Sequence, residues 1–303
     1  MVLFHYRLCH LVFRSIFGGT SIQFFNHNKH HHQFYRWRLF HLFNSKIYAK
    51  EMIEIKDIEK QFGNQKVLQD INITLPKEQL ISLIGPNGAG KSTLLSIISR
   101  LLHQDKGTVV LEDKLLTDFK SNALAKQLAI LKQSNHMELR LTIEDLVAFG
   151  RFPYSKGKLT ALDQEKINDA LAFCSLEDIR TKFLDELSGG QKQRAFLAMI
   201  IAQDTDYILL DEPLNNLDMK LSVQIMQMLQ RLVVEKKKTI VIVIHEINFA
   251  ANYSDSIVGM KNGKIFSQGA TSEVITAENL ENLFDMKFEI IEHNGTKICN
   301  YFK

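Results

Sequence analysis

The fold of this 303-residue chain is decided by the stretch Gly85-Pro86-Asn87-Gly88-Ala89-Gly90-Lys91-Ser92-Thr93. The stretch matches the phosphate-binding pattern G-x-x-x-x-G-K-[ST]. It follows an apolar run at residues 80–84 and precedes a helix-like run at residues 91–102. A strand, a glycine-rich loop and a helix in this order predict an α/β fold in which the loop binds a nucleotide polyphosphate.

The residue types in this loop have separate chemical reasons. Its glycines, Gly85, Gly88 and Gly90, let the backbone wrap closely around phosphates with the N–H groups pointing inward. Lys91 is expected to reach the β- and γ-phosphates, and the Ser92 hydroxyl to bind the Mg²⁺ that bridges them. The alternative is a plain glycine turn between a strand and a helix.

Charge and cysteine content narrow the possible partners. Residues 52–303 carry 30 Lys and Arg against 33 Asp and Glu, which argues against nucleic acid because binding its backbone needs a clustered basic surface. The three cysteines, Cys9, Cys174 and Cys299, are far apart and are expected to be reduced thiols. No apolar run approaches the roughly 18 residues that cross a bilayer, so another chain must span any membrane involved.

The first 51 residues differ from the rest in composition. They hold seven of the eleven histidines and no acid before Glu51. A transit peptide, a metal-binding cluster at residues 30–32 and sequence translated from too early a start are three interpretations. We favour the third, with Met52 as the true start, because a regular pattern begins there. Residues 1–51 are therefore expected to be disordered or not to belong to the native protein.

Hydrophobic patterns organise residues 52–303. Alternation over residues 52–58 and 67–75 predicts antiparallel strands, whereas residues 142–186 are helical in pattern and predict an inserted helical subdomain at about residues 136–186. A hairpin is expected at residues 256–267. Phe62 either stacks on an adenine ring or is a core aromatic.

Polar side chains follow the ends of three apolar strands. Gln133 follows residues 129–132, Asp211-Glu212 follows residues 207–210, and His245 follows residues 239–244. Open α/β sheets bind ligands at the carboxyl ends of their strands. A carboxylate beside a phosphate loop suits Mg²⁺, and the next one can polarise a water for in-line attack. Each residue could instead be an ordinary polar group at a strand end.

A second helix start suited to anions lies at Leu187-Ser188-Gly189-Gly190-Gln191. Ser188 is a good N-cap, and two glycines let a ligand approach the helix closely. The chain thus has two such helix starts but one set of hydrolytic residues. The alternative is simply a capped helix.

Together these residues resemble one family, the ATP-binding subunits of ABC transporters, over about 250 residues from Met52 onward. The resemblance implies a P-loop NTPase fold of the ABC cassette type, with an antiparallel β-subdomain and an inserted α-helical subdomain. It identifies residues 85–93 as the phosphate loop, Gln133 as the Q-loop glutamine and residues 187–191 as the signature. It also identifies Asp211-Glu212 as the Walker B strand end, Asp218 as the D-loop residue and His245 as the switch histidine.

The resemblance also implies a mechanism. Two copies form a head-to-tail homodimer with two ATP molecules at the interface, and the signature of one copy caps the γ-phosphate held by the other. ATP hydrolysis reopens the dimer. By this resemblance Glu212 would be the base or water-positioner, and His245 would contact the γ-phosphate. Ser92, Gln133 and Asp211 would bind Mg²⁺, and Phe62 would stack on the adenine. The trans contacts would come from Ser188, Gly189, Gly190 and Gln191.

Within the family, the sequences of residues 147–154, 202–205 and 211–219 are similar to those of importers of ferric siderophores. Vitamin B12 and haem importers are the alternatives, and a soluble ABC-type switching ATPase is the rival from another class. An importer subunit would lie at the cytoplasmic face of the plasma membrane and dock on permease subunits through residues 139–154. An extracellular binding protein would select the substrate, without touching this chain.

Overall fold

The computed structural model describes residues 52–133 and 140–302. The interpretations of residues 1–51, including the histidine cluster, lie outside the described residues, as does the beginning of the expected permease-contact segment at Leu139. Within the described residues, no helix combines the length and apolar character that crossing a bilayer requires.

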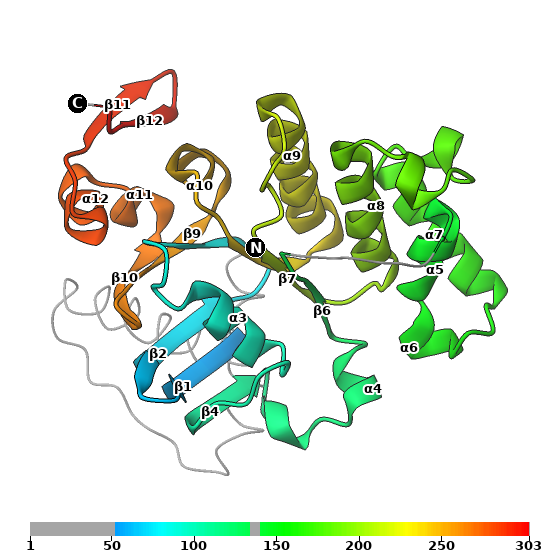
Figure 1. The fold of residues 1–303 in the computed structure, drawn as a ribbon, viewed down its shortest axis with the longest axis horizontal. Helices are drawn as coiled ribbons and strands as arrows, with labels where there is room; N and C mark the ends of the chain where they lie inside the picture. Colours follow the sequence, from blue (N-terminus) through cyan, green and yellow to red (C-terminus); the bar gives the residue numbers. More distant parts are fainter. Residues whose placement is uncertain (1–51, 134–139, 303) are drawn as a thin grey trace, which may run out of the picture. The chain divides into compact units, whose positions relative to one another are not determined.

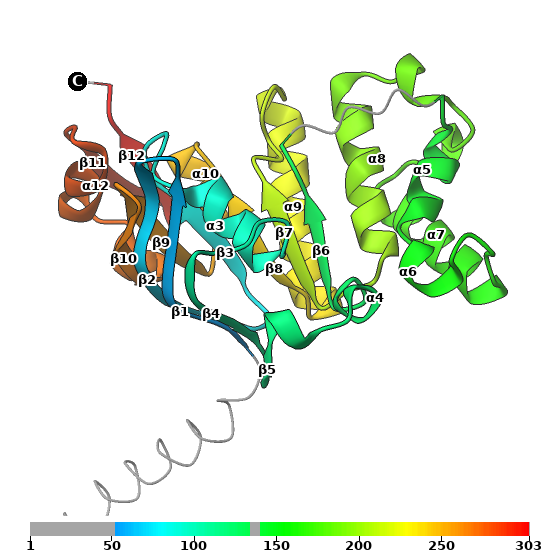
Figure 2. The same cartoon turned by 60° about the horizontal axis from the view of Figure 1, so that its bottom comes forward.

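An antiparallel sheet is built from the first two strands and a later hairpin. Its strands are β1 (Met52–Phe62), β2 (Gln65–Pro76), β4 (Lys106–Leu111) and β5 (Lys114–Leu115), in the order β2-β1-β4-β5. Ile53 and Ile55 are buried while their neighbours are less so, which is the alternation expected of a strand with one covered face. The predicted antiparallel strands are confirmed (Figure 2).

A second, mostly parallel sheet carries the site. Its strands are β3 (Leu80–Ile84), β6 (Leu128–Leu131), β7 (Tyr207–Asp211), β8 (Thr239–Val243), β9 (Ser256–Lys261) and β10 (Lys264–Ala270). Their order is β10-β9-β3-β8-β7-β6, and only the β9–β10 pair is antiparallel. The hairpin predicted at residues 256–267 is therefore confirmed.

Each face of this sheet covers a different core. Along β7, Ile208 and Leu210 belong to one buried cluster, with the larger helices α8 (Gly189–Ala202) and α9 (Met219–Lys236). Tyr207 and Leu209 point the other way, into a second cluster with α3 (Lys91–Ile98) and the antiparallel sheet. Because both faces are covered at the centre of the sheet, the strands β3, β6, β7 and β8 are apolar at almost every position, as their sequences indicate.

Helices connect the strands on both faces. They are α3 (Lys91–Ile98), α4 (Ser121–Leu124), α5 (Ile143–Phe149), α6 (Phe152–Ser155), α7 (Ala161–Phe173), α8 (Gly189–Ala202), α9 (Met219–Lys236), α10 (Ile247–Tyr253), α11 (Thr271–Val274) and α12 (Ala277–Phe284). Within the described residues, three 3₁₀ turns lie at Leu116–Asp118, Glu177–Ile179 and Leu184–Glu186. A two-stranded sheet of β11 (Glu289–His293) and β12 (Thr296–Asn300) follows.

Helices α5 to α8 lie together beside the parallel sheet, away from the antiparallel sheet (Figures 1 and 2). Capping boxes begin three of them, at Thr142 for α5, Thr160 for α7 and Ser188 for α8. Gly150 ends α5 so close to the α8 backbone that a Cβ atom there would clash with the Met199 carbonyl oxygen. Local helix caps thus fix where these helices begin, and one close backbone contact fixes how α5 packs on α8.

Candidate active site

Strand order brings the predicted polar residues to one edge of the sheet. The strands β3, β8, β7 and β6 are consecutive and parallel, so their carboxyl ends lie next to one another. β3 leads into the phosphate loop, β8 into His245, β7 into Asp211-Glu212, and β6 into Gln133. The edge therefore joins an anion-binding loop to carboxylate, amide and imidazole groups.

The phosphate loop closes around its own lysine. Lys91 is 5% exposed, and its Nζ donates to the Gly85 carbonyl at 2.7 Å and the Pro86 carbonyl at 2.9 Å. Burial lowers the pKa of Lys91, while the negative charges of Glu212 and Asp211 oppose that change. A polyphosphate would give this buried cation a stronger partner than the loop carbonyls.

Ser92 and Asp211 form the second part of the site. The Ser92 hydroxyl donates to Asp211 Oδ1 at 2.7 Å, across 119 residues of sequence. Asp211 is 7% exposed, and burial raises the pKa of its carboxyl. A hydroxyl and one carboxylate fit Mg²⁺, which takes few protein ligands and completes its shell with phosphate and water oxygens. The described residues hold no cluster of three His, Cys, Asp or Glu that could bind a metal by themselves.

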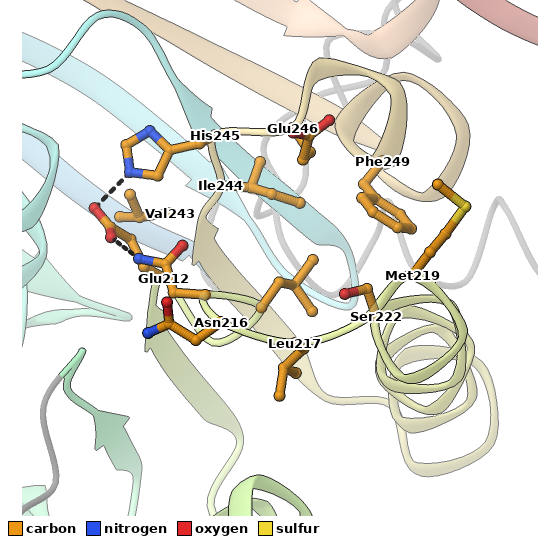
Figure 3. Close-up of a pocket in the computed structure, with 12 residues that line it drawn as sticks. Glu212, Asn216, Leu217, Met219, Ser222, Val243, Ile244, His245, Glu246 and Phe249 are labelled. Atoms are coloured by element: carbon orange, nitrogen blue, oxygen red, sulfur yellow. Dashed lines mark hydrogen bonds and ion pairs between the residues drawn. The ribbon is translucent and has the colours of Figure 1, made fainter. Parts of the chain in front are cut away.

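Glu212 is held by side chains from three segments. His245 Nε2 lies 2.6 Å from Glu212 Oε1 (Figure 3), and Gln133 Nε2 donates to Oε2 at 2.6 Å. Asn215 Nδ2 donates to the same Oε2. No sequence pattern singled out Asn215 as a partner of Glu212. The one signal was an amide side chain three residues after the predicted base.

A cavity of about 400 Å³ lies beside these residues, toward α9 and α10. Its lining combines Glu212 and His245 with the apolar side chains Leu217, Met219 and Phe249 (Figure 3). No residue of the phosphate loop lines it. The cavity is therefore a space next to the hydrolytic residues rather than the phosphate site.

The signature residues begin α8 as a capped helix. Ser188 Oγ accepts from Gln191 N–H at 3.3 Å, and Gln191 Oε1 accepts from Ser188 N–H at 3.0 Å. A Cβ at Gly190 would clash with Leu221, whereas a Cβ at Gly189 would meet no atom within 4 Å. Among the described residues, no hydrogen bond joins residues 188–191 to residues 85–93. Gly189 is thus bordered by open space at the start of α8.

The remaining predicted residues lie at element ends. Asp218 caps α9 by accepting from Leu221 N–H at 2.8 Å. Phe62 ends β1, is 50% exposed, and has Lys60 Nζ 5.5 Å from its ring centroid. Such exposure excludes the core-aromatic interpretation.

The phosphate loop, the Ser92–Asp211 pair and the polar strand ends, on a parallel sheet joined to an antiparallel one, define an ATP-binding cassette. The ABC transporter family model matches residues 68–215. The chain belongs to the ATP-binding proteins of ABC transporters, which are the ATPase subunits of those transporters.

Three similar proteins illustrate this membership. The petrobactin import ATP-binding protein YclP of Bacillus subtilis is 55% identical over 83% of this chain and 100% of the relative. The petrobactin import ATP-binding protein FatE of Bacillus anthracis is 48% identical over 80% and 96%. The dimeric structure of a bacterial ABC transporter cassette matches with a TM-score of 0.65 at 30% identity, over 73% of this chain and 99% of that one.

Proposed function

We propose that this ATPase drives the import of ferric siderophores, with petrobactin as the first candidate. The names of the two Bacillus relatives support that substrate class over the vitamin B12 and haem alternatives. They also favour a transport motor over a soluble switching ATPase. The substrate would pass through separate permease subunits after an extracellular binding protein has selected it.

The observation that carries the ATPase mechanism is Glu212, held between His245 and Gln133 beside the Ser92–Asp211 pair. In the proposed mechanism Lys91 binds the β- and γ-phosphates, and Glu212 orients and polarises the attacking water. His245 then contacts the γ-phosphate. Phe62 stacks on the adenine, and Asp218 ends the D-loop.

Mg²⁺ would be held by Ser92 and Asp211, with the Gln133 side-chain oxygen as a third ligand. When bound, the ion neutralises charge on the phosphates. The Ser92 hydroxyl and the Asp211 carboxylate lie side by side, as two ligands of one ion would. Gln133 would have to turn to present its oxygen, because its amide nitrogen faces Glu212.

A second copy of the chain would complete the site. Ser188, Gly189, Gly190 and Gln191 begin a helix whose N–H groups can bind an anion, and the open space at Gly189 suits a γ-phosphate held by the partner. The dimeric cassette structure among the relatives supports this assembly. ATP binding would close the dimer and hydrolysis would reopen it.

The permease would dock against the helices α5 and α6 at the cytoplasmic face of the plasma membrane. Phe149 and Phe152 are 46% and 59% exposed there, which is unusual for large apolar side chains. The cassette comprises residues 52–303, with residues 136–186 as its helical subdomain. No nucleic acid is expected as a partner, because this part of the chain carries no basic excess.

One complementation experiment tests both the substrate and the mechanism. The chain is expressed in Bacillus subtilis lacking YclP, and uptake of iron from ferric petrobactin is measured. We expect the wild-type chain to restore uptake and Glu212→Gln to abolish it. The purified Glu212→Gln protein should lose ATP turnover by 100-fold or more, on the order of a removed general base, while still binding ATP.

The matched control is Glu246→Gln, since Glu246 is an exposed carboxylate next to His245 without an assigned role. It should retain uptake and turnover. Unchanged hydrolysis in Glu212→Gln would contradict the role of Glu212. Full ATPase activity without restored petrobactin uptake would contradict the proposal that petrobactin is the substrate.

A further inference from the structure

We propose that Asn215 is a positioning residue that keeps Glu212 in its hydrolytic orientation throughout turnover. The inference rests on the proposed function of Glu212 as the water-polarising base. Asn215 Nδ2 donates to Glu212 Oε2, and the Asn215 backbone N–H donates to the Glu212 carbonyl at 3.2 Å. The two residues therefore belong to one turn and move together.

The other two partners of Glu212 have second tasks. In the proposed mechanism Gln133 turns to Mg²⁺ and His245 turns to the γ-phosphate, so both leave the carboxylate when nucleotide binds. Asn215 has no such task. It remains on Oε2, and Oε1, now contacted by His245, becomes free to accept a proton from water.

Glu212 needs such an anchor. Its backbone is in the left-handed region, with φ of 51°, and its side chain has three rotatable bonds between backbone and carboxylate. Without a fixed donor, the carboxylate would sample orientations in which neither oxygen faces the water. A small loss of alignment is enough to slow such a step severely.

The ordinary explanation of Asn215 is turn formation, because asparagine is common in turns. Of the two asparagines in this turn, however, it is Asn216 that has the left-handed backbone, with φ of 62°. Asn215 does not need that conformation, so the backbone alone does not account for an amide there. Its observed use is the bond to Glu212.

The test uses the full-length chain and steady-state hydrolysis of Mg-ATP. Asn215→Leu keeps the approximate shape and removes the donor. We expect its kcat to fall about tenfold or more, with KM and the affinity for a fluorescent ATP analogue within about twofold of wild type. Asn215→Ser keeps a donor and should recover most of the lost kcat. The control Asn216→Gly, which suits the positive φ, should remain near wild type.

Three results would overturn the inference. They are a wild-type kcat in Asn215→Leu, a raised kcat, and a raised KM at unchanged kcat. If Asn215→Leu melts far below wild type, Asn215→Ala and Asn215→Ser decide by the same comparison.

A parallel Glu212→Gln variant separates the two levels of proposal. If it is inactive while Asn215→Leu has wild-type activity, only the positioning role fails. If it retains hydrolysis, the proposed role of Glu212 fails and the inference fails with it. The double variant should be no slower than Glu212→Gln alone, because both changes act on one group.

Discussion

At the scale of single residues, the phosphate loop depends on glycine most strictly at its first position. Gly85 has φ of 141°, and a Cβ there would clash with the Met260 carbonyl oxygen on β9. Gly88 also has a positive φ, of 78°, but a Cβ there would meet no atom within 4 Å. Packing against β9 therefore requires glycine at position 85, whereas at position 88 only the backbone conformation favours it.

This difference predicts unequal costs for two alanine substitutions. Gly85→Ala should lower the free energy of unfolding by about 2 kcal/mol or more, because backbone strain and a backbone clash add. Gly88→Ala should cost about 1 kcal/mol, from strain alone. Urea unfolding of the full-length chain measures both, and equal costs would contradict the packing argument.

At the scale of secondary-structure elements, helices α6 to α8 meet at one buried ion pair. Arg151 Nε donates to Asp163 Oδ1 at 2.8 Å, and Arg151 also donates to the Ala202 carbonyl at 2.8 Å. Both side chains are almost fully buried. Asp163 caps α7 as well, since its other oxygen accepts from Thr160. One carboxylate thus orders a helix start and the contact between helices.

The pair makes stability depend on pH. Hydrogen bonds from Thr160 hold the pKa of Asp163 below its ordinary value of 3.8, against the opposing effect of burial and with support from Arg151. Because the folded pKa is depressed, this stabilisation is present above the ordinary pKa and is lost as pH falls through the folded pKa. The melting temperature should therefore drop steeply in acid.

Asp163→Asn should cost about 3 kcal/mol at neutral pH, because it leaves Arg151 buried without a countercharge. Its melting temperature should then fall less than that of wild type between about pH 5 and pH 3. Calorimetry over this range measures both effects. The control Glu235→Gln removes an exposed i,i+4 partner of Arg231 and should change little. Parallel pH curves for wild type and Asp163→Asn would contradict the assignment.

At the scale of the whole molecule, the site is half of an assembly in the proposed function. The N-terminus of α8 is capped and exposed at Gly189, and no hydrogen bond within the described residues links it to the phosphate loop. A dimer of cassettes would join these two helix starts around one phosphate group.

The dimer predicts a substitution that affects assembly and not folding. In the Glu212→Gln background, which should accumulate closed dimers with Mg-ATP, we expect Gly189→Gln to abolish dimerisation. The new side chain meets open space in the monomer and favours the helix, so the melting temperature should stay equal or rise slightly. Light scattering with and without ATP measures the assembly. Normal dimers in Gly189→Gln would contradict the proposed interface.

Much of the site was predictable from the sequence because its parts are local. The spacing of glycines and Lys91 in residues 85–93 determines a strand, a loop and a helix start, and Ser188 and Gln191 determine a capping box three residues apart. Apolar strands ending in Gln133 and His245 were likewise recognisable. Each depends on hydrogen bonds and burial patterns within a few residues.

The tertiary structure alone decided which of these parts touch. Strand order places Gln133 on Glu212 across 79 residues and Ser92 on Asp211 across 119. It also settled the exposure of Phe62 and revealed the bond from Asn215, which no spacing rule had identified. The physical reason is that local patterns specify strands and turns, whereas contacts between distant side chains follow from the order in which the strands pair.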